Sequence, residues 1–301
     1  MNSQFRFMSM PFELIAYRPR GRPPVTTEEV DNILSALTHF KRVDSSGEKT
    51  EWQYLNTDTG VHFALWFDPD RKSPTHLEWN DSPLAITIGL GKPSYFGYES
   101  FLIIEQVLKN LNLAALDPQK NAAYKQPAKL TADQMRISWE KSNEEETQAL
   151  LEAKKSVAFA PREKMDAFWH FMHSRPALQE TLGPEVLVPT INLHRGKDGT
   201  VKTSCIWPDA AKVALPEVDY VLVQREERKL MSKKKVSGAV PYSKIETLLK
   251  PRSTAKAEPV KHLLFDRDPD KELLESLSEL TLEPAEGLPK LTPDDIVDAK
   301  N

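Results

Sequence analysis

Hydrophobic and polar residues alternate most regularly in the second half of the chain. Two apolar runs, Val186–Leu193 and Val201–Trp207, flank a turn-rich segment that contains Asp198-Gly199. A glycine can adopt the positive φ that tight hairpin turns require, so this pattern predicts a β-hairpin. A third run, Val218–Val223, follows after two prolines. Together the three runs predict a three-stranded antiparallel meander, whose apolar face must pack on nearby helices.

The first part of the chain combines strand-like and helix-like patterns. We expect a helix from Thr26 or Thr27 to near Phe40, and a second helix that carries Phe101, Ile104, Leu108 and Leu111 on one face. Between and around them, short alternating runs predict strands at 12–17, 51–55, 61–67, 75–79, 84–88 and 114–116. This order indicates an α+β domain, and a ferredoxin-like arrangement with an inserted hairpin is one form that it could take.

A polar segment, 119–130, separates this part from a helical region and is predicted to be a linker. Thr131 and Gln134 match a capping box, so a long helix should begin there and extend roughly to Lys154. A second helix is expected over Arg162–Met172, and a third, begun by Pro176, should stop at Gly183. A last short helix is expected over 244–249.

The sequence therefore predicts an α+β protein of two domains, each an antiparallel sheet packed by helices. The expected boundaries are 1–118 for the first domain, 119–130 for the linker, 131–250 for the second domain and 251–301 for an acidic tail. The formal net charge is −4, but residues 263–301 carry a net −7, which leaves +3 on the rest. Because the tail has few apolar residues to offset its ordering entropy, we expect it to be disordered.

One island in the tail has helical periodicity. Leu273, Leu274, Leu277 and Leu280 would form an apolar stripe opposite an acidic face. A helix this short is only marginally stable alone, so it should fold on a surface. The surface could belong to a partner or to the chain itself, where the basic segment 225–235 is a candidate host. A solvated tail with an accidental leucine cluster is the other interpretation.

Composition restricts the cellular setting. The chain has 301 residues and one cysteine, Cys205, so no intramolecular disulfide can form, which fits a reducing compartment. No apolar run approaches the roughly 20 residues of a membrane-spanning helix, and the N-terminus is a poor secretory signal. These features predict a cytoplasmic protein. Cys205 lies in a predicted strand, where a buried thiol is expected and a catalytic one is not.

Four residues could carry chemistry. His170 and His173 are three apart on a predicted helix and could face one metal, but no third ligand is indicated, so we predict neither a metal nor a cofactor. Asp209 could be a general acid or base, or a turn residue. Asp219 enters a strand, where an inward carboxylate would need a partner such as Arg175 or Arg195.

Two further patterns invite a ligand interpretation. Gly89-x-Gly91 stands between a strand and a helix, as phosphate loops do, but the third glycine of the dinucleotide motif is replaced by Ser94 and no Walker pattern follows. A flexible connection is the favoured interpretation. The segment 225–235 is the best nucleic-acid candidate, yet it has no aromatic residues for base stacking, so we favour a basic hairpin tip.

The stretches EVLVPTINL, VKTSCIWPDAAKVALPEVDYVLVQRE and SRPALQETLG resemble a group of uncharacterised soluble bacterial proteins. The resemblance extends in part to ITIGLGKPSYFGYESF and LAALDPQ in the first half. Proteins of this size and style are often immunity partners of polymorphic toxins. The resemblance implies a protein partner, such as a cognate toxin, and transfers no catalytic residue.

The leading functional hypothesis is a non-enzymatic protein that binds another protein, as an immunity protein binds its toxin. It rests on the lack of a recognisable nucleophile–base pair, phosphate loop or metal cluster in the sequence. Two alternatives stay open. One is an enzyme with an interdomain site that uses His170, His173, Asp209 and Asp219. The other is nucleic-acid binding through residues 225–235.

Overall fold

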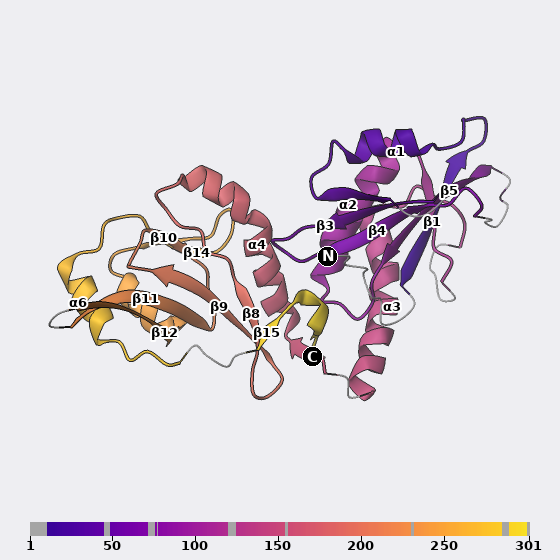
Figure 1. Cartoon of the computed structure of the whole chain (residues 1–301). Helices are drawn as coiled ribbons and strands as arrows, with labels where there is room; N and C mark the ends of the chain where they lie inside the picture. The colour runs from indigo at the N-terminus through magenta and orange to yellow at the C-terminus, as the bar shows by residue number, and fades with distance from the viewer. Residues whose placement is uncertain are drawn as a thin grey trace. The chain divides into compact units, whose positions relative to one another are not determined.

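The computed structural model describes residues 11–44, 49–71, 76, 78–119, 125–153, 156–229, 232–284 and 289–299. The chain forms two compact units, Met1–Ser156 and Val157–Asn301, which are treated separately below. Both units combine helices with β-sheets, so the α+β class predicted from the sequence is confirmed (Figure 1).

The first unit is built on a six-stranded antiparallel sheet with the strand order β2-β3-β4-β5-β1-β6. The strands are β1 (Phe12–Pro19), β2 (Phe40–Asp44), β3 (Thr50–Leu55), β4 (His62–Phe67), β5 (Trp79–Ile88) and β6 (Ala114–Leu116). The order β6-β1-β5-β4 is that of a ferredoxin-like sheet, and the hairpin β2–β3 extends it at one edge. Of the expected edge strand at 75–79, only residues 76, 78 and 79 lie within the described residues.

The described residues of this unit form the helices α1 (Thr27–Leu34), α2 (Tyr95–Asn110) and α3 (Ala132–Glu152). Helix α1 ends at Leu34, earlier than the sequence predicts, and residues 35–39 form turns before Phe40 begins β2, with His39 in a left-handed conformation of φ 71°. Helix α3 begins at the predicted capping box. The Thr131 hydroxyl accepts from the Gln134 backbone N–H, and the Gln134 side chain accepts from the Thr131 N–H.

The division between the units lies later than the predicted linker. Within that segment, the Ala128 and Ala115 backbones exchange two hydrogen bonds of 2.9 and 3.0 Å, which attach residue 128 to β6. Helix α3 packs on α2, where the α carbon of Gly97 comes so close to the Trp139 ring that a Cβ would lie 2.9 Å from it. The predicted first helix of the second domain is thus part of the first unit.

In the second unit, the described strands pair in sheets with the orders β12-β11-β9-β8-β15, β10-β14-β13 and β16-β7. Its strands are β7 (Ala158–Ala160), β8 (Asn192–Arg195), β9 (Val201–Pro208), β10 (Val213–Leu215), β11 (Tyr220–Lys229), β12 (Ser232–Pro241), β13 (Thr254–Lys256), β14 (His262–Phe265), β15 (Lys290–Leu291) and β16 (Ile296–Asp298). Its helices are α4 (Arg162–Leu182), α5 (Tyr242–Leu249), α6 (Lys271–Glu279) and a 3₁₀ turn at Pro293–Asp295.

The predicted meander is half correct. Strands β8 and β9 form the expected antiparallel hairpin, with Gly199 at φ +81°. Strand β11, however, runs parallel to β9, so the prediction of three antiparallel strands is wrong. After β9 the chain turns through Asp209 and Ala210, both at positive φ, and β10 leaves to pair with β14 in another sheet. The chain then re-enters beside β9 in the same direction.

The two helices expected on either side of Pro176 form one continuous helix, α4. The buried Leu178 keeps the second half of the helix attached to the core. The Gln179 side chain donates to the carbonyls of Gly183 and Val186 and accepts from the Val188 N–H, which fastens the helix end to the following loop. These contacts offset the loss of the one backbone hydrogen bond that a proline cannot make within a helix.

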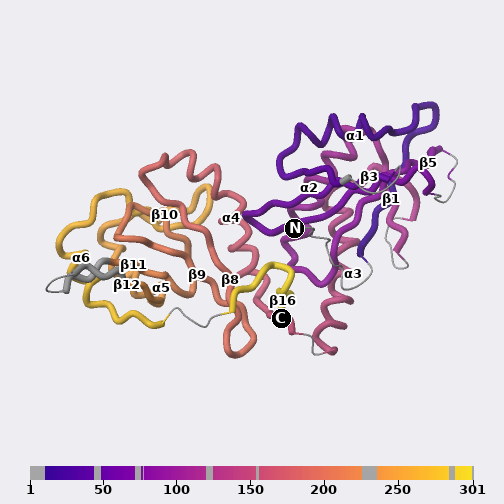
Figure 2. The backbone as a smooth tube through the Cα atoms, viewed as in Figure 1, coloured from indigo at the N-terminus to yellow at the C-terminus, as the bar shows by residue number. Residues whose placement is uncertain are grey.

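The expectation of disorder after residue 251 is not met in residues 251–284 and 289–299. Strand β14 is buried throughout and pairs with both β10 and β13. The last strands return to the start of the unit, where β15 pairs with β8 and β16 pairs with β7 (Figure 2). The segment is poor in apolar residues on average, but they are concentrated in short runs, and Ile296 and Val297 are fully buried.

Candidate binding cleft on helix α4

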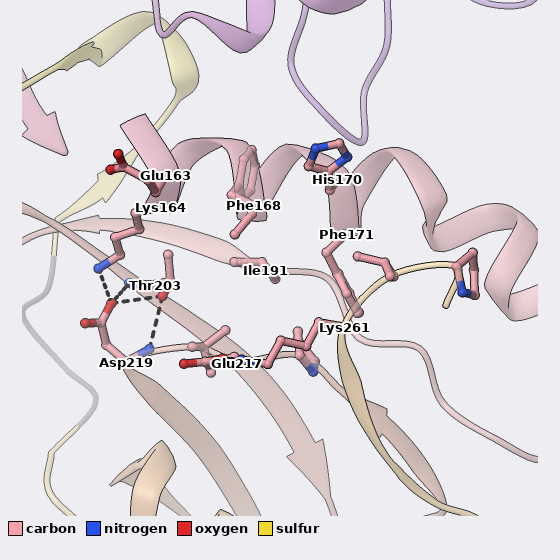
Figure 3. A pocket seen from close by; sticks show the side chains of 15 residues that line it. Glu163, Lys164, Phe168, His170, Phe171, Ile191, Thr203, Glu217, Asp219 and Lys261 are labelled. Atoms are coloured by element: carbon pink, nitrogen blue, oxygen red, sulfur yellow. Dashed lines mark hydrogen bonds and ion pairs between the residues drawn. The ribbon is translucent and has the colours of Figure 1, made fainter. Parts of the chain in front are cut away.

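A cleft of about 690 Å³ lies in the second unit beside α4 (Figure 3). Its walls are mainly apolar and come from α4, from the loop before β8, from the loop before β11 and from the loop before β14. The apolar lining residues are Ala167, Phe168, Phe171, Ile191, Pro216, Val218, Pro259 and Val260. A concave, largely apolar surface of this size with a few polar groups is typical of a ligand or partner site.

One end of the cleft is closed by a polar network around Asp219. Lys164 reaches from the first turn of α4 and places its Nζ 2.6 Å from Asp219 Oδ2 and 2.9 Å from the Val201 carbonyl (Figure 3). Thr203 of β9 donates to the same carboxylate oxygen from its backbone N–H at 2.7 Å and from its hydroxyl at 2.9 Å. The network links α4 to the central sheet of this unit.

These contacts set the ionisation of Asp219. Burial opposes the charged carboxylate, but the hydrogen bonds from Lys164 and Thr203 and the charge of Lys164 outweigh it, so the pKa of Asp219 lies below its ordinary value. The predicted partners, Arg175 and Arg195, are wrong, because Lys164 takes this role. Asp219 is therefore ionised and hydrogen-bonded at neutral pH, which is the state of a structural carboxylate.

The opposite rim carries a second ion pair, between Lys261 Nζ and Glu217 Oε2 at 2.6 Å. Glu163, on α4, is exposed and has no ion-pair partner among the described residues. One helical turn further, burial together with the charges of Asp298 and Glu163 raises the pKa of Asp166, although Arg162 and His170 counteract this. Asp166 does not line the cleft, so Glu163 is the carboxylate that α4 contributes to its rim.

The four residues predicted to carry chemistry do not lie together at one site. His170 and Asp219 both line the cleft, but the His170 ring lies on the side of α4 away from Asp219 (Figure 3). His173 is exposed and contacts the Trp169 ring at 5.4 Å between centroids. Asp209 lies in the left-handed turn after β9, outside the cleft, and its N–H donates to the Gln224 carbonyl.

The described residues contain no group of three or more His, Cys, Asp or Glu side chains that could hold a metal. Cys205 is completely buried, and burial raises the pKa of its thiol to about 12, which makes it unreactive at neutral pH. The prediction of a buried structural thiol is therefore confirmed.

The Gly89–Gly91 segment packs closely against helix α3. A Cβ on Gly91, which has φ +68°, would lie 2.5 Å from Leu150 of α3. The Asn143 side chain accepts from the Lys92 N–H at 3.0 Å and donates to the Lys92 carbonyl at 2.8 Å. The loop thus connects β5 to α2 and uses its backbone groups to bind α3, so the expectation that the connection is flexible is wrong.

Three leucines of the island, Leu273, Leu274 and Leu277, lie on α6, whereas Leu280 is the extended residue that follows the helix. Leu273 and Leu277 are buried, Leu280 is half-buried, and Leu274 is 47% exposed. The Arg225 guanidinium donates to the carbonyls of Leu277 and Leu280 at the end of this helix. A cation there satisfies carbonyls that the helix leaves open, so α6 docks on its own unit through the start of the basic segment.

Residues 226–229 and 232–235 of the basic segment pair with each other in strands β11 and β12. The side chains of residues 226–235 lie outside the described residues, so the nucleic-acid hypothesis stays a prediction.

Sequence reasoning did not find Lys164, Thr203, Glu217 or Lys261, which complete the cleft. The sequence contains one sign of this network. A charged Asp219 at the start of a strand with buried residues implied that a basic side chain from elsewhere in the chain would pair with it.

No protein-family model matches the chain, and no curated protein sequence or solved structure is detectably similar to it. In the part of the chain that the structure describes, no helix has the length and apolar character needed to cross a membrane.

Proposed function

We propose that the protein is a non-enzymatic binding protein that recognises another protein through the α4 cleft, and that it acts in the cytoplasm as an immunity protein that neutralises a bacterial toxin by direct binding. The observation that carries the proposal is the cleft itself, whose apolar walls are bounded by two ion pairs, Lys164–Asp219 and Lys261–Glu217. The resemblance to uncharacterised bacterial proteins, noted from the sequence, supplies the choice of a toxin as the partner.

The state of the ionisable groups favours binding over catalysis. A general base or nucleophile needs a pKa suited to its task, and it must lie within hydrogen-bonding distance of the reacting group. Asp219 instead has a lowered pKa and accepts three hydrogen bonds on one oxygen, from Lys164 and Thr203. His170 turns away from it, and the Thr203 hydroxyl donates to a carboxylate oxygen that Lys164 already holds, which suits a fixed binding surface better than a reactive pair.

The shape also suits a protein partner. Four apolar wall residues, Phe168, Phe171, Ile191 and Val218, expose only 2–7% of their surface, so the apolar area that they offer suits one inserted side chain better than a broad face. Binding energy in protein interfaces is concentrated in a few such anchor pockets, surrounded by contacts that exclude water. An inserted apolar anchor of the partner would supply that energy.

Co-purification from the native host tests the proposal. The full chain with an affinity tag should retain the product of a neighbouring gene, and expression of that gene alone should be toxic and relieved by this protein. The Ala167→Trp variant, which fills the cleft from its exposed rim, should lose the partner. Ala177→Trp, at an exposed position of the same helix outside the cleft, should keep it. Recovery of the protein alone, with no toxic neighbour, would contradict the proposal.

A further inference from the structure

The cleft has a charge pattern that restricts what can enter it. At its inner end Lys164 is neutralised by Asp219, with both side chains 27% exposed. On the opposite rim Lys261 is neutralised by Glu217. Neither cation is therefore available to attract an anionic group, and an acidic segment would find no compensating charge at these two ends.

Glu163 adds a negative charge to the cleft that these two ion pairs do not neutralise. It lines the cleft, is exposed and has no ion-pair partner among the described residues. Asp166 lies one helical turn further along α4, and it interacts electrostatically with both Glu163 and Asp298. Arg162 Nε lies 3.9 Å from Asp166 Oδ2, and the charges of Arg162 and His170 counteract the acidic groups around Asp166. The α4 rim thus places the Glu163 carboxylate, which has no ion-pair partner among the described residues, next to apolar walls.

We infer that the α4 cleft binds a partner segment in which an apolar side chain is followed directly by a lysine or arginine. The apolar side chain would pack against Phe168, Phe171 and Ile191, while the neighbouring cation would lie beside Glu163. The inference rests on the proposed function, since it specifies the chemistry of the partner at the same cleft. It is argued from charge complementarity: the occupant must be apolar where the walls are apolar and cationic where the rim is acidic.

Short peptide probes test the inference without knowledge of the partner. The full chain, with labelled isoleucine and valine methyl groups, is titrated by NMR with acetyl-Leu-Lys-amide, acetyl-Leu-Glu-amide and acetyl-Gly-Lys-amide at millimolar concentration. We expect saturable shifts at Ile191 and Val218 with the first peptide. Binding of the Leu-Glu peptide should be weaker by about threefold, the factor that one exposed ion pair supplies, and the Gly-Lys peptide should leave these methyl groups unchanged.

Two variants complete the design. Glu163→Gln should bring the Leu-Lys and Leu-Glu peptides close to equal affinity, because it removes the rim charge without changing the walls. Ala167→Trp should abolish the shifts at Val218, whereas Ala177→Trp should preserve them. Either no shift at Ile191 and Val218 with any peptide, or equal binding of both charged peptides to the unmodified chain, would overturn the inference. Neither result depends on a toxic neighbour, so failure here is distinguishable from failure of the proposed function.

Discussion

Lys164 and Asp219 are separated by 55 residues along the chain, yet Lys164 Nζ lies 2.6 Å from Asp219 Oδ2. This ion pair joins the first turn of α4 to the loop that enters β11. Because Thr203 donates twice to the same oxygen, α4, β9 and β11 meet at one carboxylate. The position of α4 over the sheet, and with it the shape of the cleft, depends on this group.

Removal of the carboxylate charge should therefore loosen α4. We predict that Asp219→Asn lowers the stability of the second unit by about 2 kcal/mol at pH 7, the scale of hydrogen bonds to a charged group. Because the folded-state pKa of Asp219 is lowered, its contribution is present above the unfolded value of about 4 and is lost as the pH falls through the folded pKa. The deficit of the variant should shrink accordingly in acid.

Native-state hydrogen exchange of the β9 and α4 amides, measured against pH, provides this comparison. Lys164→Met is the partner variant, and the double variant should cost less than the sum of the two single changes, because both remove the same ion pair. Equal protection of wild type and Asp219→Asn at pH 7 would show that the network does not hold the helix.

Removal of the Asp166 charge should have the opposite effect on the stability of the second unit. The pKa of this carboxyl is raised by burial and by Asp298, so its ionised form is unfavourable in the folded chain. We predict that Asp166→Asn stabilises the second unit at pH 7 by up to about 1 kcal/mol. The gain should be absent below the unfolded pKa of about 4 and complete only above the raised folded pKa. Thermal unfolding across this pH range measures it, and a variant less stable than wild type at pH 7 would refute the assignment.

In the first unit, Gly97 should tolerate no side chain. We predict that Gly97→Val destabilises the unit by about 2–3 kcal/mol, because the added carbons meet the Trp139 ring and force α2 and α3 apart. Gln106→Val introduces the same β-branched residue at an exposed position of α2 and controls for helix propensity. Urea unfolding followed by circular dichroism compares the two. Similar losses in both variants would mean that the close approach carries no energy.

Helix α6 allows a test within one element. Leu277 is 5% exposed and Leu274 is 47% exposed, so Leu277→Asp should unfold α6 locally at a cost of about 3 kcal/mol, whereas Leu274→Asp should be nearly neutral. Hydrogen exchange of α6 amides reports the difference. If Leu274→Asp released the helix as well, the exposed leucine would have a partner that the docking described above does not provide.

Local signals in the sequence predicted local structure well. Thr131 and Gln134 marked the start of α3, the Asp198-Gly199 turn marked the β8–β9 hairpin, and Leu273 and Leu277 marked the buried face of α6. Each of these depends on residues within one turn of helix or one tight turn. Such contacts leave a periodic pattern that the sequence displays directly.

Features decided by distant contacts were not predictable in the same way. The parallel pairing of β9 and β11 depends on where β10 goes, and Pro176 is tolerated because Leu178 and Gln179 hold the end of α4. The cleft itself combines segments from α4 to the loop before β14. The sequence indicated that Asp219 needed a cation, but nothing in it distinguished Lys164 from the other basic residues.

The central claim, that the α4 cleft recognises a protein partner, is tested most directly by the affinity of the co-purified partner for three forms of the chain. Isothermal titration calorimetry would compare wild type, Ala167→Trp and Ala177→Trp, after circular dichroism has shown that all three are folded. The account predicts that Ala177→Trp binds as wild type does and that Ala167→Trp loses at least about tenfold in affinity, the effect of removing one anchor contact. Equal affinity of all three forms would contradict it.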